Sequence, residues 1–506
     1  MLLTDDSLLQ YKRCHLRTFL DFYGDKSLKS PQRDFCQKLK KERISHSRQT
    51  LDIYNRPYKR PSEVSGGKND VFNLARITEE FMRQGVECIY QGVLRWDFNF
   101  DTKNQVTVIS SPTLLIKDET RSSRWGNWSY YPVNNHLGKS NKKEYKLISG
   151  LHANILGKIQ EKQPARAEII LRSHAKTYNT VLSLWIPRSE ELVAECVSML
   201  TIKDEPALFI SRQRCSFCHW YDRCYDIAKS ENHLSLIPGI TPSKLETLYE
   251  AGITDFDLLT EASIDSLQKI FPVPIAHQIY KQTLSLRTNS GVPREDQLPI
   301  LPYDDVELYF DIETEPDRNV HYLLGVVLVD RQQNHQEYYS FLAKNRDEEK
   351  AIWQEFVKFM NQYPNSPIFH YSGYETEVMK HLANLYHTPN NQLQSLLDRS
   401  FDLHQYLVNS FYLPVQNYSL KSVANWMGFY WRDPVGSDNS DSNDKKVSIA
   451  GDQCVFWYDQ WLQTNEYKWL EYILIYNHDD CYATYKLKKW LDFNIKGRGT
   501  RDEGRR

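Results

Sequence analysis

The sequence predicts a mixed α/β protein built from several domains. Its 506 residues are too many for one hydrophobic core, since single cores stop growing at about 250–300 residues. Runs of β-branched and aromatic residues alternate with segments whose apolar residues recur at helical spacing, a pattern typical of α/β folds. Hydrophobic residues make up 41% and charged residues 25%, as in globular proteins. We expect domains over residues 1–230, 231–290 and 301–495.

The first predicted element is an amphipathic helix between Leu2 and Gly24. Thr4 and Asp5 are suited to cap its start, and Gly24 to end it. Further along, a helical pattern covers Asn73–Gln84, and strand-like runs cover Val106–Lys117 and Trp128–Lys139. The first domain is therefore expected to be α/β.

A cysteine cluster is the strongest metal signal in the first half of the chain. Cys215, Cys218 and Cys224 follow a C-x2-C-x5-C spacing, with Arg212, Arg214 and Arg223 as basic neighbours. Nine cysteines in all, an odd number in a large chain, point to a reducing compartment and metal ligation. The spacing leaves open a zinc site completed by His219 or Cys14, or cysteines without a metal. An iron–sulfur cluster needs four thiolates, and Cys14 is the natural fourth.

This layout of one distant and three clustered cysteines resembles the iron–sulfur staple of AddB-type nucleases of the RecB family. The resemblance implies a 4Fe–4S cluster on Cys14, Cys215, Cys218 and Cys224, in a restriction-endonuclease-like PD-(D/E)XK domain over residues 1–230. It also implies metal-binding acids after the first strand and in the second. Thr113 and Asn134-Asn-His136 stand at those positions instead. Since Thr, Asn and His carry no negative charge, we expect this nuclease site to be inactive.

Basic and aromatic residues follow along residues 121–146. This mixture suits single-stranded nucleic acid, although a solvated helix face beside core aromatic residues would give the same pattern. The residues are Arg121, Arg124, Trp125, Trp128, Tyr130, Tyr131, Lys139, Lys142, Lys143 and Lys146.

Residues 231–290 predict a small helical domain. Pro238-Gly239 opens a loop before a helix over Ser243–Ala251, and Gly252 ends it. The stretch Leu236–Ile253 resembles a helix-hairpin-helix element, which would receive backbone phosphate, and a plain helical spacer fits equally well. Within the last domain, the polar run 436–446 predicts a mobile loop.

Two acids end the first strand of the last domain. Val306–Glu313 and Tyr322–Val329 read as strands, and alternation puts the side chains of Asp311 and Glu313 on one face. Neighbouring carboxylates repel each other unless a cation lies between them. Hard divalent cations such as Mg²⁺ prefer such oxygen ligands.

Further acids occur at the starts or on the faces of predicted helices. Glu375 opens a helix after the short strand around Phe369, and Asp402 starts another. Tyr476 and Asp480 are four residues apart and share a helix face, with Asp479 beside them. A two-metal phosphodiesterase needs about four carboxylates that converge from separate elements.

The motifs D-I-E-T, F-H-Y-S-G-Y-E and Y-N-H-D-D-C-Y-A-T resemble the ribonuclease H-like 3′–5′ exonucleases of the DEDD class. Their order, with Asn417-Tyr-Ser-Leu-Lys421, is similar to that of the YprB-like ribonuclease H domains fused behind RecB-like modules. The resemblance implies that Asp311, Glu313, Glu375 and Asp480 bind two Mg²⁺ or Mn²⁺ ions. It gives Tyr476 the role of orienting or helping to deprotonate water, and makes Asp402 and Asp479 weaker candidates. Glu375 stands where the family usually has Asp, one methylene shorter; because the charge is kept, we expect metal binding to survive.

We therefore expect a metal-dependent nuclease acting on DNA or RNA, in single strands, with a 3′–5′ exonuclease site in the last domain. The alternatives are a catalytically inactive nucleic-acid-binding protein and a scaffold that does not bind nucleic acid. The net charge of −2 confines nucleic-acid binding to local basic and aromatic surfaces. The absence of a long apolar run and the acidic start M-L-L-T-D-D predict a cytoplasmic protein without a membrane span.

Overall fold

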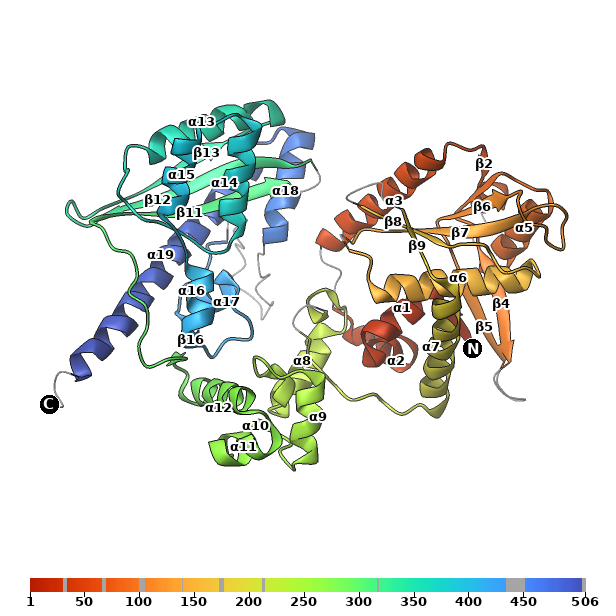
Figure 1. Ribbon diagram of the computed structural model, residues 1–506, viewed down its shortest axis with the longest axis horizontal. Coiled ribbons are helices and arrows are strands. Elements are labelled where there is room, and N and C mark those ends of the chain that lie inside the picture. Colours follow the sequence, from red (N-terminus) through yellow and green to blue (C-terminus); the bar gives the residue numbers. More distant parts are fainter. Residues whose placement is uncertain are drawn as a thin grey trace. The chain divides into compact units, whose positions relative to one another are not determined.

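The computed structural model describes residues 1–30, 34–65, 70–99, 105–138, 140–172, 177–211, 214–315, 318–433 and 451–502 (Figure 1). Contacts divide the chain into two compact units, Met1–Asp226 and Ile227–Arg506. The three-domain division stays a prediction. Lys139, Arg212 and the loop predicted at residues 436–446 lie outside the described residues. In the described part of the chain, no helix combines the length and apolar character needed to cross a bilayer.

Unit 1 contains two sheets and the helices packed on them. The six-stranded sheet has the order β2-β3-β6-β7-β8-β9, and the three-stranded sheet has the order β1-β5-β4. The strands are β1 (Leu2–Thr4), β2 (Tyr58–Lys59), β3 (Cys88–Tyr90), β4 (Leu94–Asn99), β5 (Gln105–Ser110), β6 (Leu114–Asp118), β7 (Ser129–His136), β8 (Glu168–Leu171) and β9 (Thr177–Asn179). The helices are α1 (Asp5–Arg13), α2 (His15–Tyr23), α3 (Asp34–Tyr54), α4 (Pro61–Val64), α5 (Val71–Arg83), α6 (Lys143–Ile159) and α7 (Leu182–Ile202), and α8 (Tyr221–Ser230) runs across the boundary into unit 2.

The start of the chain differs from the single helix that the apolar pattern predicts. Leu2–Thr4 form strand β1, which pairs with β5, and Thr4 caps α1. The helical path then breaks at Cys14, whose backbone is extended (φ −160°, ψ 110°) and which ends α1 and starts α2. Apolar spacing alone did not reveal this break, because the buried side chains of α1 and α2 together follow the spacing expected of the apolar face of one continuous helix.

The strand predicted over Val106–Lys117 is also two elements. β5 pairs with β1 and β4, whereas β6 pairs with β3 and β7. Between them lies Ser111-Pro112, and proline cannot donate a ladder hydrogen bond. The backbone N–H of Ser111 donates instead to Asp5 Oδ2 at 2.7 Å. One apolar run thus supplies strands to both sheets.

Unit 2 begins with helices. They are α9 (Pro242–Glu250), α10 (Phe256–Glu261), α11 (Ile264–Ile270) and α12 (Val273–Thr288). α9 confirms the helix predicted at Ser243–Ala251, with Thr241 as its cap. α12 is held to the rest of the unit by hydrogen bonds from Gln282 Nε2 to the carbonyl of Leu413 (2.8 Å) and from Ser285 Oγ to that of Tyr412 (3.0 Å).

The rest of unit 2 is organised by a five-stranded sheet with the order β13-β12-β11-β14-β15. β11 is antiparallel to β12 and parallel to β14, so it lies at the centre of a mixed sheet. The strands are β11 (Val306–Glu315), β12 (Val320–Asp330), β13 (His335–Leu342), β14 (Ile368–His370) and β15 (Ser400–Asp402), and a small pair joins β10 (Val292–Pro293) to β16 (Phe411–Tyr412). The helices are α13 (Glu349–Met360), α14 (Tyr374–Leu385), α15 (Asn390–Asp398), α16 (Leu403–Ser410), α17 (Leu420–Trp426), α18 (Gly451–Thr464) and α19 (Lys468–Asp502).

Alternation along β11 assigns its side chains to two cores. Leu308, Phe310 and Ile312 pack with residues of α13 and α14, whereas Tyr309 packs with residues of α16 and α19. Asp311 and Glu313 share the face of Tyr309, as alternation requires. The two acids therefore lie on the side of the sheet that α16 and α19 cover.

A buried ion pair attaches α19 to β11. Lys488 is fully buried, and its Nζ donates to Glu307 Oε1 of β11 at 2.8 Å and to Asp492 at 2.7 Å. α19 also lies very close to β12 at Gly325, where an added Cβ would lie 1.7 Å from Asn477 Oδ1. The sheet and α19 therefore meet at a defined register, which sets the position of the residues between Asn477 and Lys488.

A candidate metal centre on the C-terminal sheet

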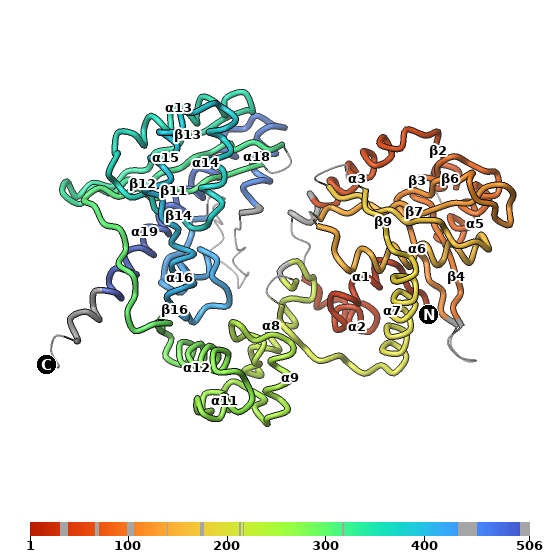
Figure 2. The backbone as a smooth tube through the Cα atoms, in the orientation of Figure 1, coloured from red at the N-terminus to blue at the C-terminus, as the bar shows by residue number. Residues whose placement is uncertain are grey.

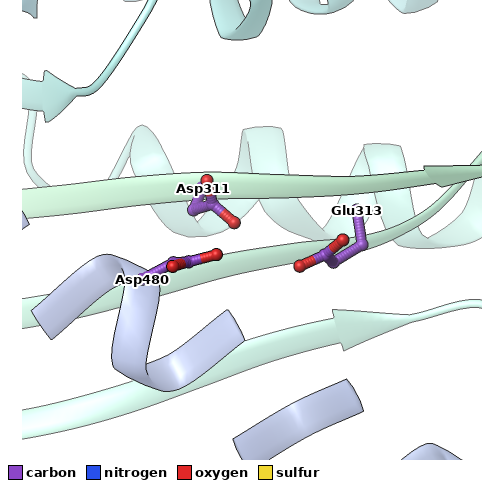
Figure 3. A group of neighbouring side chains, drawn as sticks. All are labelled: Asp311, Glu313 and Asp480. Carbon is purple, nitrogen blue, oxygen red and sulfur yellow. The ribbon is translucent and has the colours of Figure 1, made fainter. Parts of the chain in front are cut away.

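Three carboxylates converge where α19 crosses β11. Oxygens of Asp311, Glu313 and Asp480 lie within 4.8 Å of one another, and no other set of three metal-ligating side chains in the described residues does so. Figure 3 shows the two β11 acids pointing toward Asp480 of α19. Glu313 is 7% exposed, and the other two are partly exposed. The group therefore presents a compact set of oxygen ligands, which suits Mg²⁺ or Mn²⁺.

The acids make one another harder to ionise. Burial raises the pKa of Asp311 and Glu313 well above the usual range, and the charge of Asp480 raises both further. Burial likewise raises the pKa of Asp480, to about 7. Close, partly buried carboxylates with raised pKa values are stabilised by a divalent cation between them. The residues present thus fit a metal site in both ligand type and charge.

Side-chain hydrogen bonds hold the carboxylates of this group. Asn477 Nδ2 donates to Asp311 at 2.8 Å, and the hydroxyl of Tyr338 donates to Asn477 Oδ1 at 2.8 Å. The indole N–H of Trp431 donates to Asp480 at 2.8 Å. Sequence reasoning missed all three of these residues. Asn477 lies three residues before Asp480 on one helix face, a spacing that could have revealed it, whereas Tyr338 and Trp431 are brought in by the tertiary fold.

Glu375 lies beside this group but is not one of its three members. It opens α14, is 5% exposed, and accepts a hydrogen bond from Ser372 Oγ at 2.8 Å. Its second polar neighbour is His370, with Nδ1 at 3.6 Å. The charge of Glu375 contributes to the raised pKa values of Asp311 and Asp480. It is therefore near both acids while bonded to its own loop.

Tyr476 lies one turn before Asp480 on α19 and is 7% exposed. Burial raises its pKa well above the ordinary value, and the charges of Asp480, Glu313 and Asp311 add to the rise. The hydroxyl therefore remains protonated at neutral pH and is a hydrogen-bond donor. It is the tyrosine that the resemblance singles out, and it faces the acids.

The two weaker acids are engaged elsewhere. Asp402 caps α16 by accepting a hydrogen bond from the backbone N–H of Gln405 at 3.1 Å. Asp479 accepts hydrogen bonds from the backbone N–H of Arg432 at 2.8 Å and from its Nε at 2.9 Å. Neither belongs to the three-acid group.

In unit 1, the four candidate cysteines lie near one another, although Cys14 is near the start of the unit and the other three are near its end. Figure 2 shows the start of the chain, with α1 and α2, beside the segment around α8, and Asp21 accepts hydrogen bonds from His219 (2.8 Å) and Trp220 (3.1 Å). Burial raises the pKa of Cys215, Cys218 and Cys224, and the neighbouring thiols, Cys14 among them, add to the rise. Backbone N–H groups of Arg17 and Ser211 donate to the sulfurs of Cys14 (3.4 Å) and Cys215 (3.3 Å).

The spacing of these ligands bears on the choice of metal. Tetrahedral zinc holds its sulfurs about 3.8 Å apart, given a Zn–S bond of about 2.3 Å. Among the described residues, no three of the cysteine and histidine ligand atoms lie within 4.8 Å of one another. His219 Nε2 is also engaged by Asp21. These ligand atoms therefore lie farther apart than the ligands of a single tetrahedral zinc ion.

The positions expected for a nuclease site in unit 1 are occupied by a hydrogen-bond network that includes one carboxylate, Asp5, which lies 2.9 Å from Nε2 of His152. Thr113 Oγ1 donates to Asn135 Oδ1 at 2.9 Å, and Asn135 Nδ2 donates to Ser47 at 3.0 Å. Asn134 Oδ1 lies 2.5 Å from Nδ1 of His152. No three carboxylates come together among the described residues of this unit.

The basic and aromatic stretch of residues 121–146 is mainly structural. Tyr130 and Tyr131 are buried, and the indole of Trp128 donates to the carbonyl of Met82 at 3.0 Å. Arg124 pairs with Glu79 and Glu161. Tyr130 and Tyr131 therefore belong to the core, whereas Lys142 and Lys143 are exposed, and the binding of single strands along this stretch stays a prediction.

Comparison with known proteins agrees with the fold of unit 2. No curated protein matches the chain. Residues 308–492 match the family model described as the RNase_H superfamily, and this stretch contains most of β11 and of α19 and all three acids. The C-terminal part of the chain is thus an RNase H-like domain, a fold typical of nucleases that hydrolyse phosphodiester bonds with divalent metal ions.

Proposed function

We propose that the protein is a metal-dependent nuclease whose active site is the three-acid group of unit 2. The observation that carries this proposal is the convergence of Asp311, Glu313 and Asp480 within 4.8 Å, inside the stretch that matches the RNase H superfamily. Asp311, Glu313 and Asp480 would hold two Mg²⁺ or Mn²⁺ ions with Glu375. Bound ions would activate water and stabilise the leaving oxygen of a phosphodiester.

The surrounding side chains would orient the reactants. Tyr476, protonated at neutral pH, would donate a hydrogen bond to the attacking water. Its role would therefore be to orient the water rather than to remove a proton from it. Asn477 and Trp431 would keep the oxygens of Asp311 and Asp480 directed at the metals through their 2.8 Å hydrogen bonds. The positive charge of Lys421 lowers the pKa of Asp480 and would attract a phosphate to the site.

For the substrate we propose a single strand of DNA or RNA, digested from its 3′ end in the cytoplasm. Tyr374 supports an aromatic contact to a base. Tyr374 is 46% exposed, and its hydroxyl donates to Thr314 at 2.8 Å. Partial burial raises its pKa, and the charges of the nearby Glu375, Glu313 and Asp311 raise it further. A ring that borders the acids and faces solvent is suited to stack on a terminal nucleotide.

For unit 1 we propose a 4Fe–4S cluster held by Cys14, Cys215, Cys218 and Cys224 in a RecB-like domain without nuclease activity. The convergence of the four cysteines, the N–H groups directed at Cys14 and Cys215 and the neutral residues at Thr113, Asn134 and His136 support it. When bound, such a cluster would join the two ends of the unit.

The test is cleavage of 5′- and 3′-labelled single-stranded DNA and RNA by anaerobically purified protein with Mn²⁺, beside Asp311→Ala. We expect a ladder from the wild type and loss of at least about 10³-fold in the variant, as for loss of a metal ligand. Equal activity of both proteins would move the chemistry to unit 1. Retained binding without cleavage by either would favour the inactive nucleic-acid-binding protein.

A further inference from the structure

A second polar group lies inside unit 1, away from the cysteines. We call it the histidine cluster: His46 of α3, Asn134 and His136 of β7, and His152 of α6. His152 contacts Asn134 through Nδ1 (2.5 Å) and Asp5 through Nε2 (2.9 Å). His136 interacts electrostatically with both His152 and His46, so the four side chains surround one region.

The cluster contains buried polar atoms without protein partners. Nε2 of His46, Nε2 of His136 and Nδ2 of Asn134 are all buried and make no hydrogen bond. His46 is 6% and Asn134 3% exposed. Asn134 Nδ2 is a donor, and each imidazole Nε2 is a donor in one of its two tautomers. A buried polar group left unpaired costs about 1–3 kcal/mol, so three in one region indicate that a polar ligand belongs there.

The charges around the cluster select an anion. Burial lowers the pKa of His136 to about 3, which leaves its imidazole neutral at pH 7, and the positive charges of Arg43 and Arg13 add to the fall. The acids nearby are already paired: Asp5 with His152 at 2.9 Å, and Glu144 with Arg13 at 3.7 Å. A metal cation would be repelled by the guanidinium groups, and no three ligand atoms converge among the described side chains of this cluster.

The cluster also reaches the surface. Arg43 is exposed, and Arg13 and His136 are partly exposed. The ring of His136 stacks on Tyr145 with centroids 3.8 Å apart, which holds it at the edge of the cluster. An anion would therefore meet the two arginines first and the buried donors behind them.

We propose that the histidine cluster, with Arg13 and Arg43, binds a backbone phosphate of a nucleic-acid strand directly, without a metal ion. The amide and imidazole donors and the guanidinium groups are the chemistry that recognises phosphate oxygens. Unit 1 would then hold a strand at this site. The proposal does not depend on catalysis in unit 2.

The test uses the full chain with Asp311→Asn, which prevents cleavage, in EDTA. Affinity for a labelled single-stranded oligonucleotide is measured by anisotropy in this background and after adding Arg43→Gln or His136→Gln. Arg48→Gln is the matched control, because Arg48 is exposed on the same helix but is not among the charges that act on His136. Carbethoxylation of His136, detected by mass spectrometry, reports on the site itself. The reaction is run with the oligonucleotide, with inorganic phosphate or with Mn²⁺, to see which of them protects His136.

We expect Arg43→Gln and His136→Gln each to weaken binding about tenfold, as for loss of a charge-assisted hydrogen bond, and Arg48→Gln to have no such effect. The oligonucleotide should protect His136. Unchanged affinity in both variants would overturn the proposal, as would protection by Mn²⁺ or by inorganic phosphate but not by the oligonucleotide. Because Arg43 is exposed, Arg43→Gln should fold normally, and thermal unfolding checks this. If His136→Gln is unstable, Arg43→Gln still tests the proposal.

Discussion

At the scale of single residues, ionisation of the three acids of unit 2 lowers the stability of the fold, and a bound metal cation would offset this loss. A carboxylate whose pKa is higher in the folded than in the unfolded protein favours folding at low pH, and this stability is lost as the pH rises through the folded pKa. Asp311, Glu313 and Asp480 all have raised pKa values, that of Asp480 lying at about 7. Metal-free unit 2 should therefore become less stable between about pH 4 and pH 7.

The first prediction follows from this loss of stability with rising pH. Mn²⁺ binds the ionised acids, so its stabilising effect should be small at pH 5.5 and reach about 5 °C or more in melting temperature at pH 8. Differential scanning calorimetry with Mn²⁺ and with EDTA measures it. In Asp480→Asn the effect should largely disappear; a metal effect independent of pH would contradict the assignment.

The second prediction concerns Tyr476. Replacing it by Phe removes the hydroxyl that would orient water, and we expect kcat to fall about 10–100-fold. The metal ligands remain, so the stabilisation by Mn²⁺ should be unchanged. Tyr472→Phe, one turn earlier on α19, is the control and should leave kcat within about twofold. Loss of the Mn²⁺ effect in Tyr476→Phe would indicate a structural role instead.

The third prediction concerns Glu375, which is bonded to Ser372 yet close to Asp311 and Asp480. Glu375→Gln should weaken Mn²⁺ affinity and lower kcat/KM about 10–100-fold, less than Asp311→Ala. Glu377→Gln is a suitable control, since Glu377 is on the same helix but 70% exposed in its side chain. Equal activities of the two variants would remove Glu375 from the site.

At the scale of elements, α19 carries Tyr476, Asn477 and Asp480, and its attachment to β11 is ionic as well as apolar. Lys488 and Glu307 are both fully buried, and Glu307 also accepts hydrogen bonds from Tyr309 and Arg331. This network determines where α19 lies along the sheet. The geometry of the acids therefore depends on residues two turns away from them.

The fourth prediction tests this attachment. Lys488→Met leaves buried Glu307 with Arg331 as its cationic partner among the described residues and should cost about 3–5 kcal/mol in the free energy of unfolding of unit 2. Urea denaturation measures the change. The double variant Glu307→Gln, Lys488→Met should recover part of it, because no buried charge is left unpaired. No recovery would show that packing of the lysine stem, rather than charge, explains the loss.

At the scale of the whole chain, the four cysteines join segments about two hundred residues apart. The fifth prediction is that anaerobically purified protein contains iron and sulfide, and that Cys14→Ser loses them and is less stable in unit 1. Closing so long a loop contributes on the order of 5 kcal/mol in a chain-entropy account. Cys88→Ala, a buried cysteine outside the group, should keep its iron. Stoichiometric zinc in place of iron would contradict the proposal.

Local patterns determined those features that depend on neighbours along the chain. Alternation in β11 placed Asp311 and Glu313 on one face, and the four-residue spacing in α19 placed Tyr476 and Asp480 together. The helix predicted at Ser243–Ala251 was equally readable and lies at Pro242–Glu250. Each follows from backbone periodicity, which acts over a few residues.

The tertiary structure alone decided which distant groups meet. It joined Asp480 to the β11 acids, brought Trp431 and Tyr338 to the site, and left Glu375 beside the group. It also broke the first helix at Cys14 and divided residues 105–118 between two sheets. These outcomes depend on strand pairing, buried charge and close approach at Gly325, which involve residues far apart in the chain and therefore leave no short-range pattern in it.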